Sequence, residues 1–143
     1  MKKVIALILL TTLLFGENSI KFASSYKKAL DSARENGKSI LFITTIKGCP
    51  VCDYIKDIVL KREKIVDYVN EHFVVVLKDA ERDHYPKRFH TIDMPTFYFI
   101  DADSEEYLRK PKVGGATPKQ FLSILKGVIE PDLNTTVEEK GEK

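Results

Sequence analysis

Two cysteines, three positions apart, are the residues of this sequence that could carry covalent chemistry. Cys49 and Cys52 are the only cysteines in the chain, and Pro50 and Val51 lie between them. At the start of a helix, a pair at this spacing can close a small disulfide ring. Pro50 would then occupy the first helical position, where the N–H that proline lacks has no partner in any case.

The first turn of such a helix would stabilise negative charge on Cys49. Its free N–H groups and the helix dipole favour an anion, and a thiolate is an anion. Sites of this kind lower a cysteine pKa from about 8.5 toward about 3.5–7. Cys52 lies one turn further along and is expected to be more buried. The pair therefore predicts thiol–disulfide exchange, in which Cys49 forms a mixed disulfide with a partner and Cys52 resolves it.

Two other interpretations of the cysteine pair stay open. The pair could bind a metal ion with a histidine such as His90, as in a metal-delivery module, although zinc usually takes four ligands and there is no second cysteine pair. It could also be a purely structural disulfide, but a ring over two intervening residues removes little chain entropy and so stabilises little. Covalent haem attachment is excluded because Asp53, not histidine, follows Cys52.

Length and charge exclude several other classes of function. The chain has 143 residues, enough for one domain, with 23 Lys and Arg against 21 Asp and Glu. Removal of residues 1–16 takes away Lys2 and Lys3 and no acid, which leaves 21 charges of each sign. A neutral chain gives no electrostatic reason to expect a nucleic-acid partner.

Residues 1–16 have the pattern of a secretory signal peptide. Lys2 and Lys3 precede an uncharged apolar run from Val4 to Phe15, and Gly16 ends it. The run is too short to span a hydrocarbon core about 30 Å thick. We therefore expect a cut after Gly16 and export to an oxidising compartment, which we take to be the bacterial periplasm. A leader that is retained as an anchor is the alternative.

Helices and strands are predicted to alternate along the chain. Apolar residues at helical spacing predict helices over residues 22–36, around residues 65–69 and from Thr117 onward. The same spacing of Val51, Ile55, Ile58 and Val59 predicts a helix that begins at the cysteines. Short apolar runs predict strands over residues 39–45, 72–78 and 96–100, with residues 106–110 as the hairpin partner of the last.

This order predicts an α/β fold with a central mixed four-stranded sheet flanked by helices. The first two strands are joined by a helix and should be parallel, whereas the last two are joined by a short turn and should form an antiparallel hairpin. The domain should cover residues 17–130. Residues 131–143 are polar and should form a disordered tail.

Four features together resemble the thioredoxin superfamily. An apolar strand leads into the cysteine pair, a second strand follows, Met94-Pro95-Thr96 opens the third strand, and Val113-Gly114-Gly115-Ala116 precedes the last helix. The resemblance covers roughly residues 21–129. The stretch from Ala33 to Ile40 is also similar to secreted thioredoxin-like proteins and to the thioredoxin-like domain of membrane electron conduits.

The resemblance implies roles for the matched residues. Cys49 would be the nucleophile and Cys52 the resolving thiol. Pro95 would follow a cis peptide bond beside the cysteines, and the backbone at Met94 would pair with an extended substrate segment. Pro50 and Val51 would support the pair, and the apolar surface near Gly48, Met94 and Gly114 would receive the partner protein.

Two departures from the family pattern bear on the redox chemistry. Family members usually carry a buried acid six residues before the first cysteine, where this chain has Ile43, so that water or Lys78 would have to assist Cys52. Strong oxidases carry a histidine between the cysteines, where this chain has Pro50 and Val51. We therefore expect a reduction potential between about −270 and about −120 mV, the values of thioredoxin and of a strong periplasmic oxidase.

Together these observations predict a periplasmic thiol–disulfide oxidoreductase, a reductant or relay rather than a primary oxidase. Its only redox group would be the Cys49–Cys52 disulfide, with no further cofactor and no metal. Its partners would be protein thiols and disulfides and a membrane-linked electron donor. We expect a monomer that binds no nucleic acid.

Overall fold

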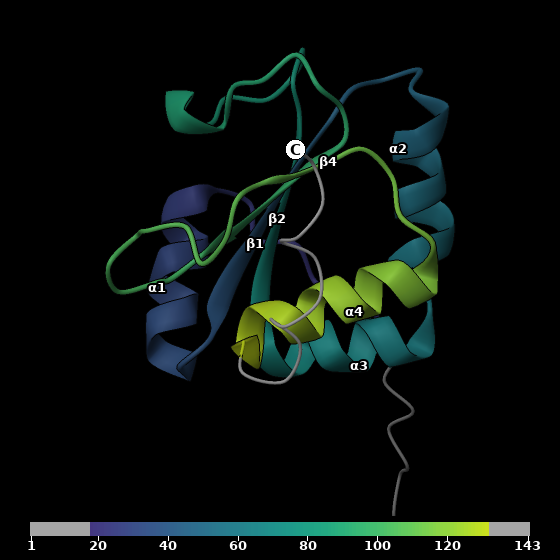
Figure 1. Cartoon of the computed structure of the whole chain (residues 1–143). Helices are drawn as coiled ribbons and strands as arrows, with labels where there is room; N and C mark the ends of the chain where they lie inside the picture. Colours follow the sequence, from purple (N-terminus) through teal and green to yellow (C-terminus); the bar gives the residue numbers. More distant parts are fainter. Residues whose placement is uncertain (1–17, 132–143) are drawn as a thin grey trace, which may run out of the picture.

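The computed structural model describes residues 18–131, which form a four-stranded sheet with helices on both faces (Figure 1). The predicted leader, residues 1–16, and residues 132–143 of the predicted tail lie outside the described residues. In chain order the elements are α1 (Tyr26–Asn36), β1 (Ser39–Thr45), α2 (Pro50–Tyr54), η1 (Ile55–Val59), α3 (Glu63–His72), β2 (Phe73–Asp79), η2 (Lys87–Phe89), β3 (Thr96–Ile100), β4 (Lys112–Val113) and α4 (Pro118–Ile129).

The sheet has the mixed topology that the sequence predicts. Its strand order is β2-β1-β3-β4. Strands β1 and β2 are parallel, whereas β3 is antiparallel to both β1 and β4. The predicted fold class is therefore confirmed, and the parallel pair carries the crossover that contains the two cysteines.

The central strand β1 is buried on both faces, which explains its continuous apolar run. Leu41 and Ile43 pack in the core under η1, α3 and α4. Ile40 and Phe42 pack in the core on the opposite face, under α1. In Figure 1, α3 and α4 lie together on one side of the sheet and α1 lies on the other. Because β1 is held on both faces, the loop that follows it starts from a fixed point.

Two predicted boundaries are wrong, each for a local reason. Helix α1 begins at Tyr26 rather than at Phe22, because Ser25 caps it and Phe22 forms an isolated parallel bridge with Val75 of β2. The partner of β3 is β4 at Lys112–Val113, not residues 106–110, which contribute only a bridge at Tyr107. Pro111 has no N–H to donate to a ladder, so regular pairing resumes only after it.

The helix after the cysteines has a wider turn than the sequence predicts. Residues Ile55–Val59 form a π-helical turn, in which the Leu60 N–H donates to the carbonyl of Ile55 at 2.9 Å. Of the four apolar residues at helical spacing, Ile55 and Val59 are buried, whereas Val51 and Ile58 are exposed. The extra residue in the turn rotates Ile58 outward, and Val51 lies in the first turn at the surface.

Candidate active site

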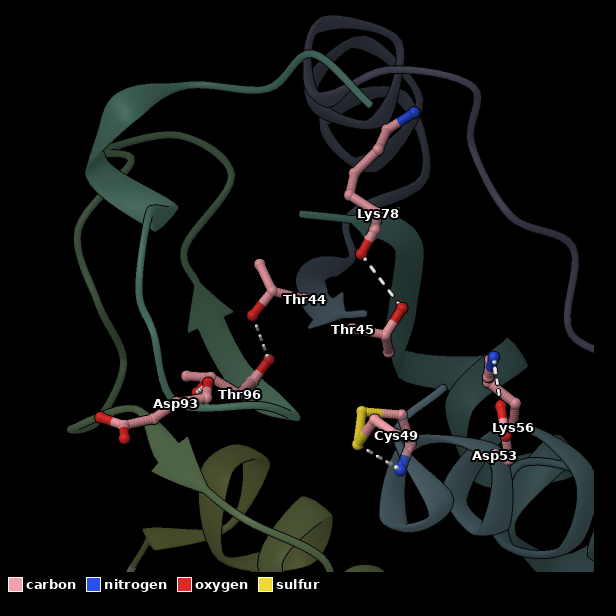
Figure 2. The surroundings of a disulfide bond; sticks show 9 residues. Thr44, Thr45, Cys49, Asp53, Lys56, Lys78, Asp93 and Thr96 are labelled. Carbon is pink, nitrogen blue, oxygen red and sulfur yellow. Dashed lines mark hydrogen bonds and ion pairs between the residues drawn. A yellow bond between two sulfur atoms is a disulfide. The ribbon is translucent and has the colours of Figure 1, made fainter. Parts of the chain in front are cut away.

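The two cysteines form a disulfide at the start of α2. Their Cα atoms are 5.2 Å apart. Cys49 is the N-cap residue, Pro50 is the first helical residue, and the backbone N–H of Cys52 donates to the Cys49 sulfur at 3.1 Å (Figure 2). A backbone N–H aimed at this sulfur favours negative charge on it. The local geometry is therefore the one that the residue types predict.

The two sulfurs differ in their exposure to a partner. Cys49 is half-buried, whereas Cys52 is fully buried at 0% exposure. Gly48, which precedes the pair, is exposed and has a φ of 78°, a conformation that favours glycine. This turn redirects the chain from the end of β1 into α2. An incoming group can therefore reach Cys49 from the surface but not Cys52.

The loop before β3 lies at the same end of the sheet. The peptide bond between Met94 and Pro95 is cis, Pro95 is buried and Met94 is half-buried. The Thr44 hydroxyl donates to the carbonyl of Thr96 at 3.4 Å, so the end of β1 is tied to the start of β3 (Figure 2). The predicted residues Met94 and Pro95 thus lie at the same end of the sheet as the disulfide.

A glycine turn after β4 completes the site and contacts both other segments. The Gly114 N–H donates to the carbonyl of Pro95 at 2.8 Å, and Gly114 has a φ of 79°. A Cβ atom on Gly115 would lie only 2.6 Å from the Val51 side chain. The sequence singles out Gly114 but not Gly115. Two consecutive glycines are the signal in the sequence that could have indicated both roles. Gly114 allows the backbone turn, and Gly115 allows the close approach to Val51.

Each of the three segments that form the site carries an exposed apolar side chain. Val51 is 45% exposed and Val113 is 50% exposed, and Ile92, three residues before Pro95, is 97% exposed. Tyr54 and Ile58 continue the exposed apolar side of the helix away from the disulfide. An apolar rim of this kind is suited to a polypeptide partner rather than to a charged small molecule.

Ile43, the position at which the resemblance implies an acid, is part of the apolar core. Ile43 is fully buried in the same cluster as Ile55 and Phe97. Lys78 does not replace the acid, because its ammonium donates to the Ser24 carbonyl at 2.9 Å and points away from the disulfide (Figure 2). Within residues 18–131, no hydrogen bond joins an ionisable side chain to either sulfur. Proton transfer at Cys52 is therefore left to water or to the partner.

Three threonine hydroxyls lie among the polar groups around the disulfide (Figure 2). Besides Thr44, the Thr45 hydroxyl donates to the Lys78 carbonyl at 3.2 Å, and the Thr96 hydroxyl donates to the Asp93 carbonyl at 2.6 Å (Figure 2). All three threonines are buried, and each of these hydroxyls donates to the main chain. They fix the loops around the site and add no charge to it.

The most strongly shifted pKa belongs to a tyrosine on the face of the sheet that α1 covers. Burial, together with the neighbouring Glu105 carboxylate, raises the pKa of Tyr26 to about 12. Near the disulfide, the exposed pair of Asp53 and Lys56 is 2.8 Å apart. An exposed ion pair of this kind is screened by water and contributes little.

Among the described residues, no third metal ligand joins the two cysteines. Within the part of the chain that the structure describes, no three or more His, Cys, Asp or Glu side chains gather as a metal site would require. The His90 ring instead packs against Tyr85, with ring centres 4.8 Å apart. His90 therefore does not join Cys49 and Cys52.

Replacement of Gly115 by alanine should disturb the site through Val51. The new methyl group would overlap the Val51 side chain, and overpacking of this kind typically costs about 1–3 kcal/mol. We expect a lower free energy of unfolding in urea and several-fold slower reaction with a peptide disulfide. Gly127→Ala on α4 is the matched control, because its Cβ would meet no atom within 4 Å. If Val51→Ala fails to restore the Gly115→Ala variant, the steric explanation is wrong.

Comparisons with known proteins agree with this geometry. The family model described as "Thioredoxin-like domain" matches residues 26–129. No curated protein matches the chain significantly. No helix among residues 18–131 has the length and apolarity to cross a membrane.

Solved structures with the same fold include several redox proteins. A putative disulphide isomerase from Bacteroides thetaiotaomicron is 26% identical, with a TM-score of 0.66 over 80% of this chain and 96% of that one. A thioredoxin from Thermus thermophilus is 22% identical, with a TM-score of 0.67 over 78% and 88%. A structure titled "DsbH Oxidoreductase" is 20% identical, with a TM-score of 0.62 over 78% and 85%.

Proposed function

We propose a direction and a location for the redox chemistry of this chain, which belongs to the thioredoxin-like family and is a thiol–disulfide oxidoreductase. It works in the periplasm as a reductant or relay that passes electrons to the disulfides of partner proteins. The asymmetry of the pair supports exchange through Cys49, which is reachable and receives a backbone N–H, whereas Cys52 is buried. The observation that carries the direction is the lack of a histidine between the two cysteines.

The reduced protein would act in two exchange steps. The Cys49 thiolate attacks one sulfur of the partner's disulfide, so a mixed disulfide forms and the partner's other sulfur leaves as a thiolate that takes a proton from water. Cys52 then loses its proton and attacks the Cys49 sulfur. The Cys49–Cys52 bond forms and the partner leaves with its second thiol. Two electrons have passed from this protein to the partner.

The exposed apolar rim supports a polypeptide as the partner. Val51, Val113 and Ile92 are exposed apolar side chains on the three segments of the site. We propose that the main chain at Met94, before the cis bond to Pro95, pairs with an extended segment of the partner. Pro50 and Val51, which lie between the cysteines, have no side-chain donor that could stabilise a thiolate as a histidine would. This favours a relay over a strong oxidase. A relay in an oxidising compartment needs a donor that re-reduces it, and we propose a membrane-linked one.

The redox state of the pair in living cells tests the direction. Cells are quenched in acid, free thiols are alkylated, and the mass of the processed chain is read. We expect mostly free thiols in the periplasmic fraction and a mass that corresponds to cleavage of the leader. A pair that is mostly closed in growing cells would contradict the reductant direction, and a chain found in the cytoplasm would contradict the location.

A further inference from the structure

Lys112, on the edge strand β4, directs its charged end back onto its own chain. Its ammonium donates to the carbonyl oxygens of three consecutive residues: Val113, Gly114 at 3.3 Å and Gly115 at 3.2 Å. An ammonium has three N–H donors, so this one turn occupies all of them. No carboxylate of the described residues lies within ion-pair distance of Lys112.

The turn that Lys112 holds, residues 113–115, contacts the site at two points. The Gly114 N–H donates to the Pro95 carbonyl at 2.8 Å. Gly115 lies so close to Val51 that an added Cβ would overlap that side chain. A small displacement of the turn would therefore be felt both at the loop before β3 and at the first turn of α2.

Packing alone does not hold this turn in place. An open pocket of about 430 Å³ lies beside it, lined by Lys112, Gly115, Ala116, Gln120, Ser123 and Ile124. Val113 is half-exposed, and β4 is a two-residue strand at the edge of the sheet. The turn thus has few contacts on its α4 side that could replace a lost hydrogen bond.

A positive charge at the centre of the turn should favour its conformation. Three carbonyl dipoles that point toward one place repel one another, and a cation among them offsets that repulsion. Hydrogen bonds from a charged donor are also stronger than neutral ones. Without the ammonium, the carbonyls would turn toward water, and the Gly114 N–H would move with them.

We propose that Lys112 is a positioning residue, whose ammonium holds residues 113–115 against Pro95 and Val51 and thereby shapes the surface that receives the partner's main chain beside Cys49. This inference rests on the proposed exchange with partner proteins. Lys112 touches neither sulfur, so it should matter for a peptide partner and not for a small thiol that needs only access to Cys49.

The test compares Lys112→Met with Lys112→Arg and with Lys110→Met. Methionine keeps the length and removes the charge, and arginine keeps the charge. Lys110 is an exposed lysine nearby for which the structure shows no hydrogen bond or ion pair. Lys110→Met therefore also removes one positive charge, but it leaves the hydrogen bonds of Lys112 to the turn in place. Three quantities are measured on the oxidised protein: hydrogen exchange of the Gly114 amide, the rate of oxidation of a two-cysteine peptide, and the rate of reduction by dithiothreitol.

For Lys112→Met we expect faster exchange of the Gly114 amide and a peptide rate that falls about tenfold through a higher KM, because small misplacements of a binding surface are costly. The dithiothreitol rate should be unchanged. Lys112→Arg should recover part of both losses, and Lys110→Met should behave as the wild type. If Lys112→Met does not fold, Lys112→Gln, which also lacks the charge, should give the same pattern.

Two results would overturn the inference. One is wild-type protection of the Gly114 amide in the uncharged variant. The other is an equal loss of rate with the peptide and with dithiothreitol, which would indicate general loosening. Failure of the proposed function is a separate outcome: the wild type would then react with neither reagent, while the Gly114 amide would still report whether Lys112 holds the turn.

Discussion

A Cys52→Ser variant is expected to accumulate a stable mixed disulfide with a peptide through Cys49, whereas Cys49→Ser should lose exchange by about a thousandfold or more. The reason is access: Cys49 is half-buried at the surface, and Cys52 is fully buried. In Cys52→Ser the first step still occurs, but no thiol is left to resolve the adduct. The measurement is the intact mass of each variant after incubation with a peptide disulfide.

The double variant Cys49→Ser/Cys52→Ser controls for loss of the disulfide itself. Because the ring closes over two residues, its removal should cost little stability, and both single variants should remain folded. An adduct on Cys49→Ser as abundant as that on Cys52→Ser would show that Cys52 is also reachable. The assignment of Cys49 as the attacking residue would then be wrong.

Replacement of Ile43 by aspartate should have the largest effect on stability. Ile43 is fully buried in the core beneath η1, α3 and α4, where a carboxylate would find neither water nor a cation. An unpaired buried charge typically costs about 3–5 kcal/mol. We expect a loss of this size in the free energy of unfolding at pH 7, measured in urea. Ile43→Val is the matched control and should cost about 1 kcal/mol.

The sign of the pH dependence follows from the same burial. Desolvation would raise the pKa of the introduced carboxyl in the folded state above its unfolded value of about 3.9. The protonated form is therefore tolerated below that value, and stability is lost as the pH rises through the folded pKa. The deficit of Ile43→Asp relative to Ile43→Val should grow from pH 4 toward pH 7. A deficit that does not change with pH would mean that water reaches position 43.

Much of the frame around the site could be predicted because it depends on local patterns. Strands β1 and β3 match their predicted ranges, since each is a continuous apolar run buried on both faces. The start of α4 is also as predicted: Thr117 and Gln120 form a capping box, and Pro118 takes the first turn. Such signals are complete within a few residues of sequence.

The errors arise where the outcome depends on contacts across the fold. The outward side chain of Ile58 results from the π-helical turn, which no periodicity at 3.6 residues can reveal. The close approach of Gly115 to Val51 joins residues that are far apart in the sequence. The sequence suggests that Lys78 could assist Cys52, yet its ammonium binds the Ser24 carbonyl. Lys112 carries no signal in the sequence, yet its ammonium binds a turn of the site.

The reduction potential of the Cys49–Cys52 pair is the most direct test of the central claim. The protein is equilibrated in buffers of varied reduced and oxidised glutathione, quenched with acid and read by intact mass after alkylation. A redox-active pair without a thiolate-holding histidine should have a potential between about −270 and about −120 mV. A potential below about −300 mV, in the range of structural disulfides, would contradict the account, because such a bond would not exchange with partners.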